Sequence, residues 1–358
     1  MTHFYPLTIK EVKQETSDCV SIAFTVPNKL TDIFAYTQGQ YLTLKATING
    51  EELRRSYSIC SSPLDTVLRV AVKQVAGGLF SGYANAHLKA GDQLQVMPPM
   101  GRFFVPLDPA HKKGYVAIAA GSGITPILSI IKTTLLTEPL SRFLLVYSNR
   151  WRKSIIFKDE LDALKNKFVD RLSIVHLLSR EKMDAPLNIG RMDAAKCTQL
   201  FGKIIDLPTT DEFFICGPEE MTLTVKAQLQ QHGVESEKIH IELFTAAVKA
   251  DRAFISKTTM ADTEEKSLIT VKLDGTAFSF DLGRDSINIL DAAMEHGADL
   301  PYSCKSGVCC TCRAKLVEGE VTMEVNYGLE PDEIEQGFIL TCQSHPTSPR
   351  VVIDFDVK

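Results

Sequence analysis

The chain has 358 residues, of which 44% are hydrophobic and 23% are charged, and its formal net charge is −5. This length exceeds what one ordinary core accommodates and predicts two or three domains. The composition is typical of globular proteins. The negative net charge argues against a general nucleic-acid-binding protein, which would present a basic face.

The charge is unevenly spread along the chain. From residue 266 onward there are fifteen Asp and Glu but only eight Lys and Arg, whereas the first 265 residues hold 29 acidic and 31 basic residues. An acidic C-terminal region favours a docking surface for a positively charged partner, and ordinary solubility explains it equally well.

Neither a signal peptide nor a membrane span is expected. The N-terminus lacks the charged start and apolar middle of a signal sequence, and the longest apolar stretch, residues 116–131, is interrupted by glycine, serine and proline. We therefore expect a cytoplasmic protein without membrane contact. Its nine cysteines are expected to be reduced, so their clustering points to metal or redox chemistry.

Residues 1–108 are expected to form a small antiparallel β-barrel. Short segments such as CVSIAFTVP, QYLTLKATING and VLRVAVKQVAGG are rich in β-branched and aromatic residues. Asn49 and Gly50 fit a hairpin turn, because both tolerate positive φ. Closely spaced strands of this kind are typical of a barrel.

Residues 109–245 predict an α/β domain with a parallel sheet. The apolar runs YVAIAA, FLLVYS, LSIVHLLS and EFFICG alternate with helical stretches such as KDELDALKNK and EEMTLTVKAQLQQHG. In YVAIAAGSGITPILSII a strand leads through a glycine turn into a helix. We expect Thr125 to cap this helix and Pro126 to be its first residue. Such a helix start can bind phosphate.

Residues 246–265 are polar and mixed in charge, and they are expected to form a linker. Residues 266–358 contain a hairpin pattern, LITVKLDGTAFSFDL, a helical stretch, INILDAAMEHG, a cysteine-rich loop and further strands. This arrangement predicts one compact α+β domain.

The cysteine-rich loop carries the strongest chemical signal. Cys304, Cys309 and Cys312 lie in CKSGVCCTC, and Cys342 follows after 29 intervening residues. This C-x4-C-x2-C…C spacing is typical of a plant-type [2Fe–2S] centre. A structural zinc site would more often use two short pairs of ligands, whereas here the grouping is three plus one. Cys310 is a fifth cysteine for which no ligand role is needed.

Four further motifs occur in a fixed order: RSYS at residues 55–58, GGLFS at 77–81, GSGITP at 121–126 and CGP at 216–218. In this order they resemble the ferredoxin–NADP reductase superfamily over residues 1–245. With the C-terminal cysteine motif, the whole chain is similar to the reductase components of bacterial multicomponent oxygenases. This resemblance implies FAD as the flavin and a β-grasp ferredoxin fold for the C-terminal domain.

The resemblance also implies roles for individual residues. Arg55 would pair with the flavin pyrophosphate, Tyr57 would pack on the isoalloxazine ring, and Ser58 would lie near the flavin atom that accepts hydride. Ser58 and Cys216 would border the reacting atoms. The other implied flavin and nucleotide contacts are Gly78, Leu79, Ser81, Gly121, Gly123, Thr125, Pro126, Ser148, Arg150, Gly217, Pro218 and Phe244.

The end of the second strand of the α/β domain bears on the choice of nucleotide. The segment YSNRWRK places Arg150, Arg152 and Lys153 where a 2′-phosphate would lie, and no acidic residue stands there to bind a free 2′-hydroxyl. This favours NADPH over NADH, although a solvated basic turn would look the same.

The resemblance implies that electrons pass from NADPH to FAD, then to the [2Fe–2S] centre and on to an external di-iron oxygenase. Reductases for Rieske-type steroid hydroxylases or for hybrid-cluster proteins share this domain order and are an alternative. A non-catalytic redox sensor is a third hypothesis, against which the flavin and nicotinamide motifs argue.

Overall fold

The computed structural model describes residues 3–244, 265–284 and 286–357. The chain divides into two compact units. The first comprises residues 4–53 and 57–244, and the second comprises the C-terminal region together with residues 3 and 54–56. The expected linker at 246–265 lies outside the described residues, apart from Glu265.

The N-terminal half of the first unit is a six-stranded sheet in the order β4-β3-β6-β1-β2-β5. Its strands are β1 (Tyr5–Thr16), β2 (Cys19–Thr25), β3 (Tyr41–Ile48), β4 (Glu51–Ser58), β5 (Leu68–Lys73) and β6 (Gln93–Val96). An antiparallel bridge between Ile59 and Val70 joins the end of β4 to β5, so the sheet closes on itself. The predicted antiparallel barrel is confirmed.

Local sequence explains how this barrel is built. Asn49 and Gly50 both have positive φ, at 54° and 83°, which is the geometry of the predicted hairpin turn between β3 and β4. A helix that the sequence did not predict, α1 (Leu79–Ala86), follows β5. It buries Phe80 and Ala84 in the core of the barrel.

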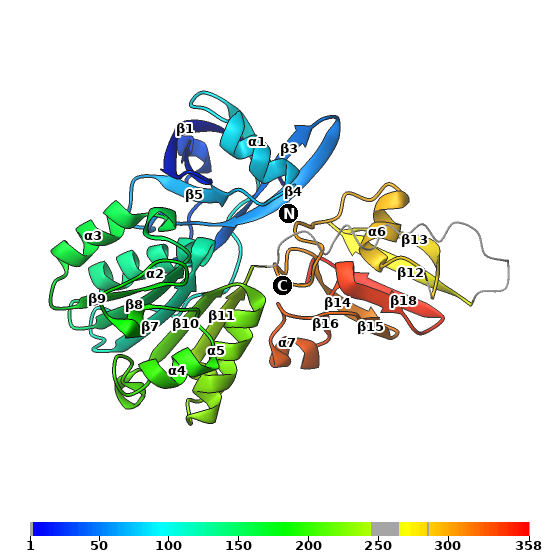
Figure 1. Cartoon of the computed structure of the whole chain (residues 1–358). Helices are drawn as coiled ribbons and strands as arrows, with labels where there is room; N and C mark the ends of the chain where they lie inside the picture. Colours follow the sequence, from blue (N-terminus) through cyan, green and yellow to red (C-terminus); the bar gives the residue numbers. More distant parts are fainter. Residues whose placement is uncertain (1–2, 245–264, 285, 358) are drawn as a thin grey trace. The chain divides into compact units, whose positions relative to one another are not determined.

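The other half of the first unit is a parallel sheet in the order β11-β10-β7-β8-β9. Its strands are β7 (Gly114–Ala120), β8 (Arg142–Asn149), β9 (Leu172–Leu178), β10 (Glu212–Gly217) and β11 (Ile239–Leu243), and its helices are α2 (Ile124–Thr137), α3 (Lys158–Lys167), α4 (Ala194–Leu200) and α5 (Glu219–Gln231). Two hydrophobic clusters cover the sheet. One includes side chains of α2 and α3, and the other includes side chains of α4 and α5. The predicted α/β layer is therefore confirmed (Figure 1).

The start of α2 differs from the prediction. A single 3₁₀ turn, η2 (Gly121–Gly123), runs directly into the helix, so Gly123 and not Thr125 is the capping residue. The Thr125 hydroxyl instead donates to the Ser122 carbonyl at 3.0 Å. Pro126 is the third helical residue, and its missing N–H costs no hydrogen bond because the first turn lacks acceptors for its N–H groups.

The second unit contains a mixed sheet in the order β13-β12-β18-β14-β16 and a small two-stranded sheet of β15 and β17. The strands are β12 (Lys266–Leu273), β13 (Thr276–Gly283), β14 (Arg313–Glu318), β15 (Val321–Met323), β16 (Phe338–Leu340), β17 (Ser344–Pro346) and β18 (Arg350–Asp354); the helices are α6 (Ile289–Glu295) and α7 (Pro331–Glu335). The predicted hairpin is β12–β13, and α6 packs into the core beneath the sheet. This is the expected α+β fold.

Within the described part of the chain, every helix is too short or too polar to cross a bilayer.

Candidate functional site

The end of β4 carries the residues expected to face the flavin. Arg55 and Tyr57 are two positions apart on the strand, so their side chains leave the same face. The ring of Tyr57 is half-buried and lies 5.6 Å from the ring of Phe80, at an angle of 35°. The first turn of α1 therefore supports an aromatic surface beside the RSYS strand.

The GGLFS motif forms the start of α1. Gly78 is the capping residue, and Leu79, the first helical residue, is 49% exposed. The Ser81 hydroxyl accepts from the backbone N–H of Val75 at 3.1 Å and donates to the Gly78 carbonyl at 3.2 Å. Because this hydroxyl proton is already used, the backbone N–H groups of the first turn are the donors left for a phosphate.

A second candidate phosphate site lies at the carboxyl ends of β7 and β10. Gly121 has a φ of 54°, and the Tyr147 hydroxyl donates to its carbonyl at 2.8 Å. A Cβ added to Gly123 would overlap the Cys216 carbonyl oxygen. Glycine is therefore required for the GSG turn to lie against the CGP segment.

Lys73 was missed by the sequence analysis. Its Nζ lies 3.8 Å from the position that a Cβ would occupy on Gly121, and 3.7 Å from the Asp18 carboxylate. An ammonium group beside a phosphate-binding turn can pair with phosphate oxygens. In the sequence, the only feature that could have pointed to Lys73 is its position at the end of a strand shortly before GGLFS.

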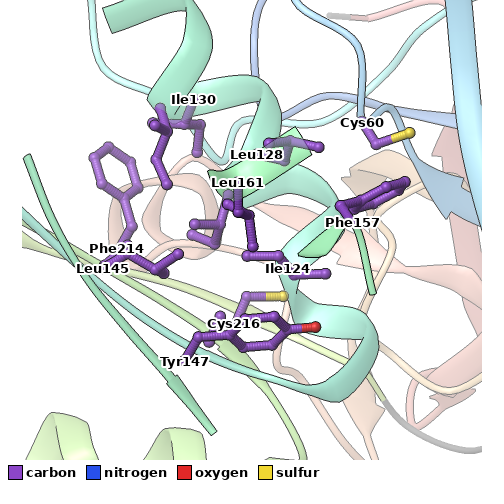
Figure 2. Close-up of a cluster of buried hydrophobic side chains, with 14 of the residues drawn as sticks. Cys60, Ile124, Leu128, Ile130, Leu145, Tyr147, Phe157, Leu161, Phe214 and Cys216 are labelled. Carbon is purple, nitrogen blue, oxygen red and sulfur yellow. The ribbon is translucent and has the colours of Figure 1, made fainter. Parts of the chain in front are cut away.

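At the ends of β4, β10 and β11, the predicted site residues Ser58 and Cys216 lie beside Glu242. The Ser58 hydroxyl donates to the Glu242 carboxyl group at 3.2 Å, and Glu242 is the register partner of Cys216 between the parallel strands β10 and β11. Figure 2 shows Cys216 within the same buried cluster as Ile124 and Tyr147. The hydroxyl, the carboxyl and the thiol thus come from three strands distant in sequence.

Burial determines the protonation of these groups. It raises the pKa of Glu242 to about 8, an effect that the Ser58 hydrogen bond partly opposes. It also raises the pKa of Cys216 well above its usual value, with the neighbouring Glu242 adding to the shift. At neutral pH both groups are protonated, so this part of the site carries no charge of its own.

Phe244 directly follows Leu243, the last residue of β11. Its backbone N–H donates to the Gly217 carbonyl at 3.3 Å, and its side chain packs partly buried against the main core. Pro218 caps α5, so the CGP segment is another strand-to-helix turn at the same edge of the sheet.

The basic turn after β8 borders an open pocket of about 430 Å³, which is lined by Trp151, Arg152, Lys153, Lys158 and Glu181. Ser148 is half-buried at the end of β8, and Arg150 is exposed. The backbone N–H of Arg152 donates to Glu181 at 2.7 Å. Arg152 is therefore held near an acidic residue, whereas Lys153 and Arg150 project their charges to solvent.

The four ligand candidates in the second unit form two pairs. The Cys309 thiol donates to the Cys304 sulfur and lowers the pKa of Cys304 well below its usual value. The Cys312 thiol donates to the Cys342 sulfur in the same way. Among the described residues no group of three or more possible ligands is gathered around a single ion position. A [2Fe–2S] cluster takes two thiolates per iron, so two adjacent pairs fit it better than one zinc ion.

The backbone of the cysteine loop also fits a negatively charged cluster. The N–H groups of Ser306 and Cys309 both point at the Cys304 sulfur, at 3.4 Å. Cys310 stands outside the two pairs. It has a φ of 54°, and its sulfur lies so close to Gly328 that a Cβ there would overlap it. Cys310 is half-buried and packs against the hydrophobic core of this unit.

Comparison with known proteins bears on all three regions. Residues 6–105 match the family described as oxidoreductase FAD-binding domain, residues 117–227 match the oxidoreductase NAD-binding domain, and residues 271–347 match the 2Fe-2S iron-sulfur cluster binding domain. A subunit of 1,2-phenylacetyl-CoA epoxidase from Escherichia coli (strain K12) is 45% identical over 100% of this chain and 99% of its own length.

The chain belongs to the FAD- and NAD-binding ferredoxin reductases that carry a C-terminal [2Fe–2S] domain. The ferredoxin reductase component of 3-ketosteroid-9-alpha-monooxygenase from Rhodococcus rhodochrous is 34% identical over 98% of this chain and 96% of its own length. The solved structure of phthalate dioxygenase reductase is similar over 98% of both chains, with 25% identity and a TM-score of 0.58.

This ferredoxin reductase is an NAD(P)H-dependent oxidoreductase with FAD and a [2Fe–2S] cluster as its cofactors. When bound, FAD accepts a hydride from NAD(P)H and releases the two electrons singly to the cluster. The uncharged surroundings of Ser58 and Cys216 suit a hydride transfer, which needs neither a general acid nor a general base.

Proposed function

We propose that this reductase uses NADPH and supplies electrons to a di-iron oxygenase, the phenylacetyl-CoA epoxidase of phenylacetate degradation. The observation that carries the proposal is the 45% identity to one subunit of that epoxidase over the full length of both chains. The partner oxygenase would receive its electrons one at a time from the cluster in the C-terminal unit.

The flavin would be held by residues of the barrel. Arg55 would pair with its pyrophosphate as a guanidinium fork, and Tyr57 would pack on its ring system, supported by Phe80. The backbone N–H groups of Leu79 and Ser81, at the start of α1, would complete the phosphate contacts.

The nicotinamide nucleotide would bind across the carboxyl edge of the parallel sheet. Gly121 and Gly123, with the Lys73 ammonium beside them, would hold its pyrophosphate. The nicotinamide ring would lie near Cys216, with the hydride directed toward the flavin atom beside Ser58. Thr125, Pro126, Gly217 and Pro218 would shape this turn and bring no charge to it.

NADPH preference would come from the basic turn after β8. Arg150 is exposed at the strand end and Lys153 lines the pocket of about 430 Å³, so both can reach a 2′-phosphate. The exposed ring of Trp151 in the same pocket offers a flat surface for the adenine.

The iron–sulfur cluster would be ligated by Cys304 and Cys309 on one iron and by Cys312 and Cys342 on the other. The thiol pairs described above support this division. Three ligands come from one loop, whose left-handed residues Lys305 and Gly307 turn it tightly enough to bring them together.

The alternative acceptor is a Rieske-type steroid hydroxylase. Ferredoxin reductase components of 3-ketosteroid-9-alpha-monooxygenase are 34% and 35% identical to this chain, which supports a steroid-hydroxylating partner as the alternative. Assays of product formation with purified oxygenase components of both kinds distinguish the two acceptors. With NADPH and this reductase, we expect product from the phenylacetyl-CoA epoxidase components at least tenfold faster than from a Rieske monooxygenase component. The reverse order would overturn the proposed partner and leave the reductase assignment intact.

A further inference from the structure

The side chain of Gln343 lies between the fourth cysteine and the loop that holds the other three. It follows Cys342 in the 3₁₀ turn η8 (Thr341–Gln343). Its amide nitrogen, Nε2, donates to the Lys305 carbonyl at 3.1 Å and to the Cys342 carbonyl at 2.9 Å, and it lies 3.7 Å from the Cys342 sulfur. All three neighbours are acceptors, so the nitrogen and not the oxygen of the amide faces them.

The side chain of Gln343 is buried and closely surrounded. Gln343 is only 8% exposed, and its backbone carbonyl accepts from Glu324 at 2.9 Å. A Cβ on Gly307 would lie 3.2 Å from the Gln343 Cγ and 2.9 Å from the Val325 carbonyl oxygen. The absence of a side chain at Gly307, where φ is 74°, therefore leaves the space that the glutamine stem occupies.

The first and the last cysteine of the ligand set both accept hydrogen bonds from the loop. Cys304 accepts from the N–H groups of Ser306 and Cys309, which belong to its own loop. Cys342 comes from a distant segment of the chain. Its sulfur accepts from the backbone N–H of Gly307 in the loop, and the Gln343 amide is a side-chain donor beside it. A donor at a thiolate stabilises negative charge, which increases by one unit when the cluster takes up an electron.

We propose that Gln343 is a positioning residue that ties the fourth cysteine to the three-cysteine loop and makes reduction of the [2Fe–2S] cluster more favourable. The inference rests on the proposed ligand set. One N–H of the amide is committed to Lys305, and the other is shared between the carbonyl and the sulfur of Cys342. The same group thus holds the loop in register and donates toward the cluster.

The test is the reduction potential of the full-length protein carrying Gln343→Met, which keeps the length and packing of the side chain but removes both N–H donors. We expect about two irons per chain, as in the wild type, with a shifted EPR spectrum of the reduced cluster. The one-electron reduction equilibrium should be three- to tenfold less favourable, a potential lower by about 30 to 60 mV. Gln343→Glu, which places a carboxylate against three acceptors, should give a larger shift in the same direction.

Gln336→Met is the matched control, because Gln336 is exposed at the end of α7. It should leave the potential and the EPR spectrum at their wild-type values. Full iron content in Gln343→Met with an unchanged potential and spectrum would overturn the proposal.

If Gln343→Met fails to assemble a cluster, the iron and labile sulfide content of Gln343→Lys tests the proposal, because lysine restores N–H donors at a similar distance from the backbone. Recovered iron and labile sulfide would support the tie between Cys342 and the loop, and continued loss would contradict it. Failure of the ligand set itself has a separate signature. In that case Cys342→Ser would keep a cluster with the wild-type EPR spectrum.

Discussion

A carboxyl group that keeps its proton at neutral pH lies beside the Ser58 hydroxyl. Glu242 owes this to burial, which raises its pKa to about 8, and Cys216 next to it is neutral for the same reason. A charge in this position would act on the flavin ring that the RSYS strand is expected to bind. If the flavin binds as proposed, the neutral Glu242 would keep charge away from its ring system.

The pKa of Glu242 makes the stability of the apoprotein depend on pH. The native state keeps a proton that the unfolded chain releases above its ordinary pKa of 4.5. The free energy of unfolding therefore falls as pH rises from about 4.5 to about 8, compared with a protein that has a non-titrating residue at position 242. Glu242→Gln lacks this titration. We expect the Tm of this variant minus the Tm of the wild type, both measured by circular dichroism, to increase as pH rises across this window. An equal Tm difference at pH 5 and pH 8 would contradict a raised pKa of Glu242.

Nucleotide preference is also a property of single residues. A charge-assisted contact to the 2′-phosphate contributes about 1.5–3 kcal/mol, so Arg150→Ala should lower kcat/KM for NADPH roughly 10- to 100-fold. The value for NADH should barely change, because NADH lacks the phosphate. Lys153→Ala, in the pocket-lining position, should show the same contrast if it shares the contact. Equal losses with both nucleotides would show that the basic cluster is only a solvated turn.

At the scale of elements, the sequence predicted most strands and helices because their periodicity is local. The segment 158–167 was expected as a helix and is α3, and the segment 212–217 was expected as a strand and is β10. The start of α2 was misplaced, because the 3₁₀ turn of Gly121–Gly123 carries no pattern of its own. The contact between Ser58 and Glu242 could not be predicted, since 184 positions separate them and only the packing of strands brings them together.

The GSG turn offers a test at this scale. A Cβ on Gly123 would overlap the Cys216 carbonyl oxygen, so Gly123→Ala must push the start of α2 away from the CGP segment. We expect reduction of the flavin by NADPH to slow at least tenfold while bound flavin, measured by absorbance, stays at the wild-type level. Gly82→Ala in α1 is the control, because nothing lies within 4 Å of its added Cβ. Normal flavin reduction in Gly123→Ala would mean that the turn does not bind the nucleotide.

At the scale of the whole molecule, the residues proposed to bind flavin and nicotinamide belong to the first unit, except for Arg55, which groups with the second unit. The cysteines proposed as cluster ligands also belong to the second unit. The domain boundaries at residues 108, 245 and 265 stay predictions. A chain that ends at residue 250 should fold, bind FAD and reduce ferricyanide with NADPH, but it should not support the oxygenase. Insoluble protein or loss of flavin would show that the two units share a core.

The central claim is that electrons enter from the nucleotide at the flavin and leave through the cluster. Anaerobic stopped-flow mixing of the full-length protein with NADPH tests it most directly. We predict a first phase in which the flavin absorbance is lost and a second phase in which the cluster is reduced. In Cys342→Ser the first phase should remain and the second should disappear. Reduction of the cluster without prior loss of flavin absorbance, or no reaction of the flavin with NADPH or NADH, would contradict the account.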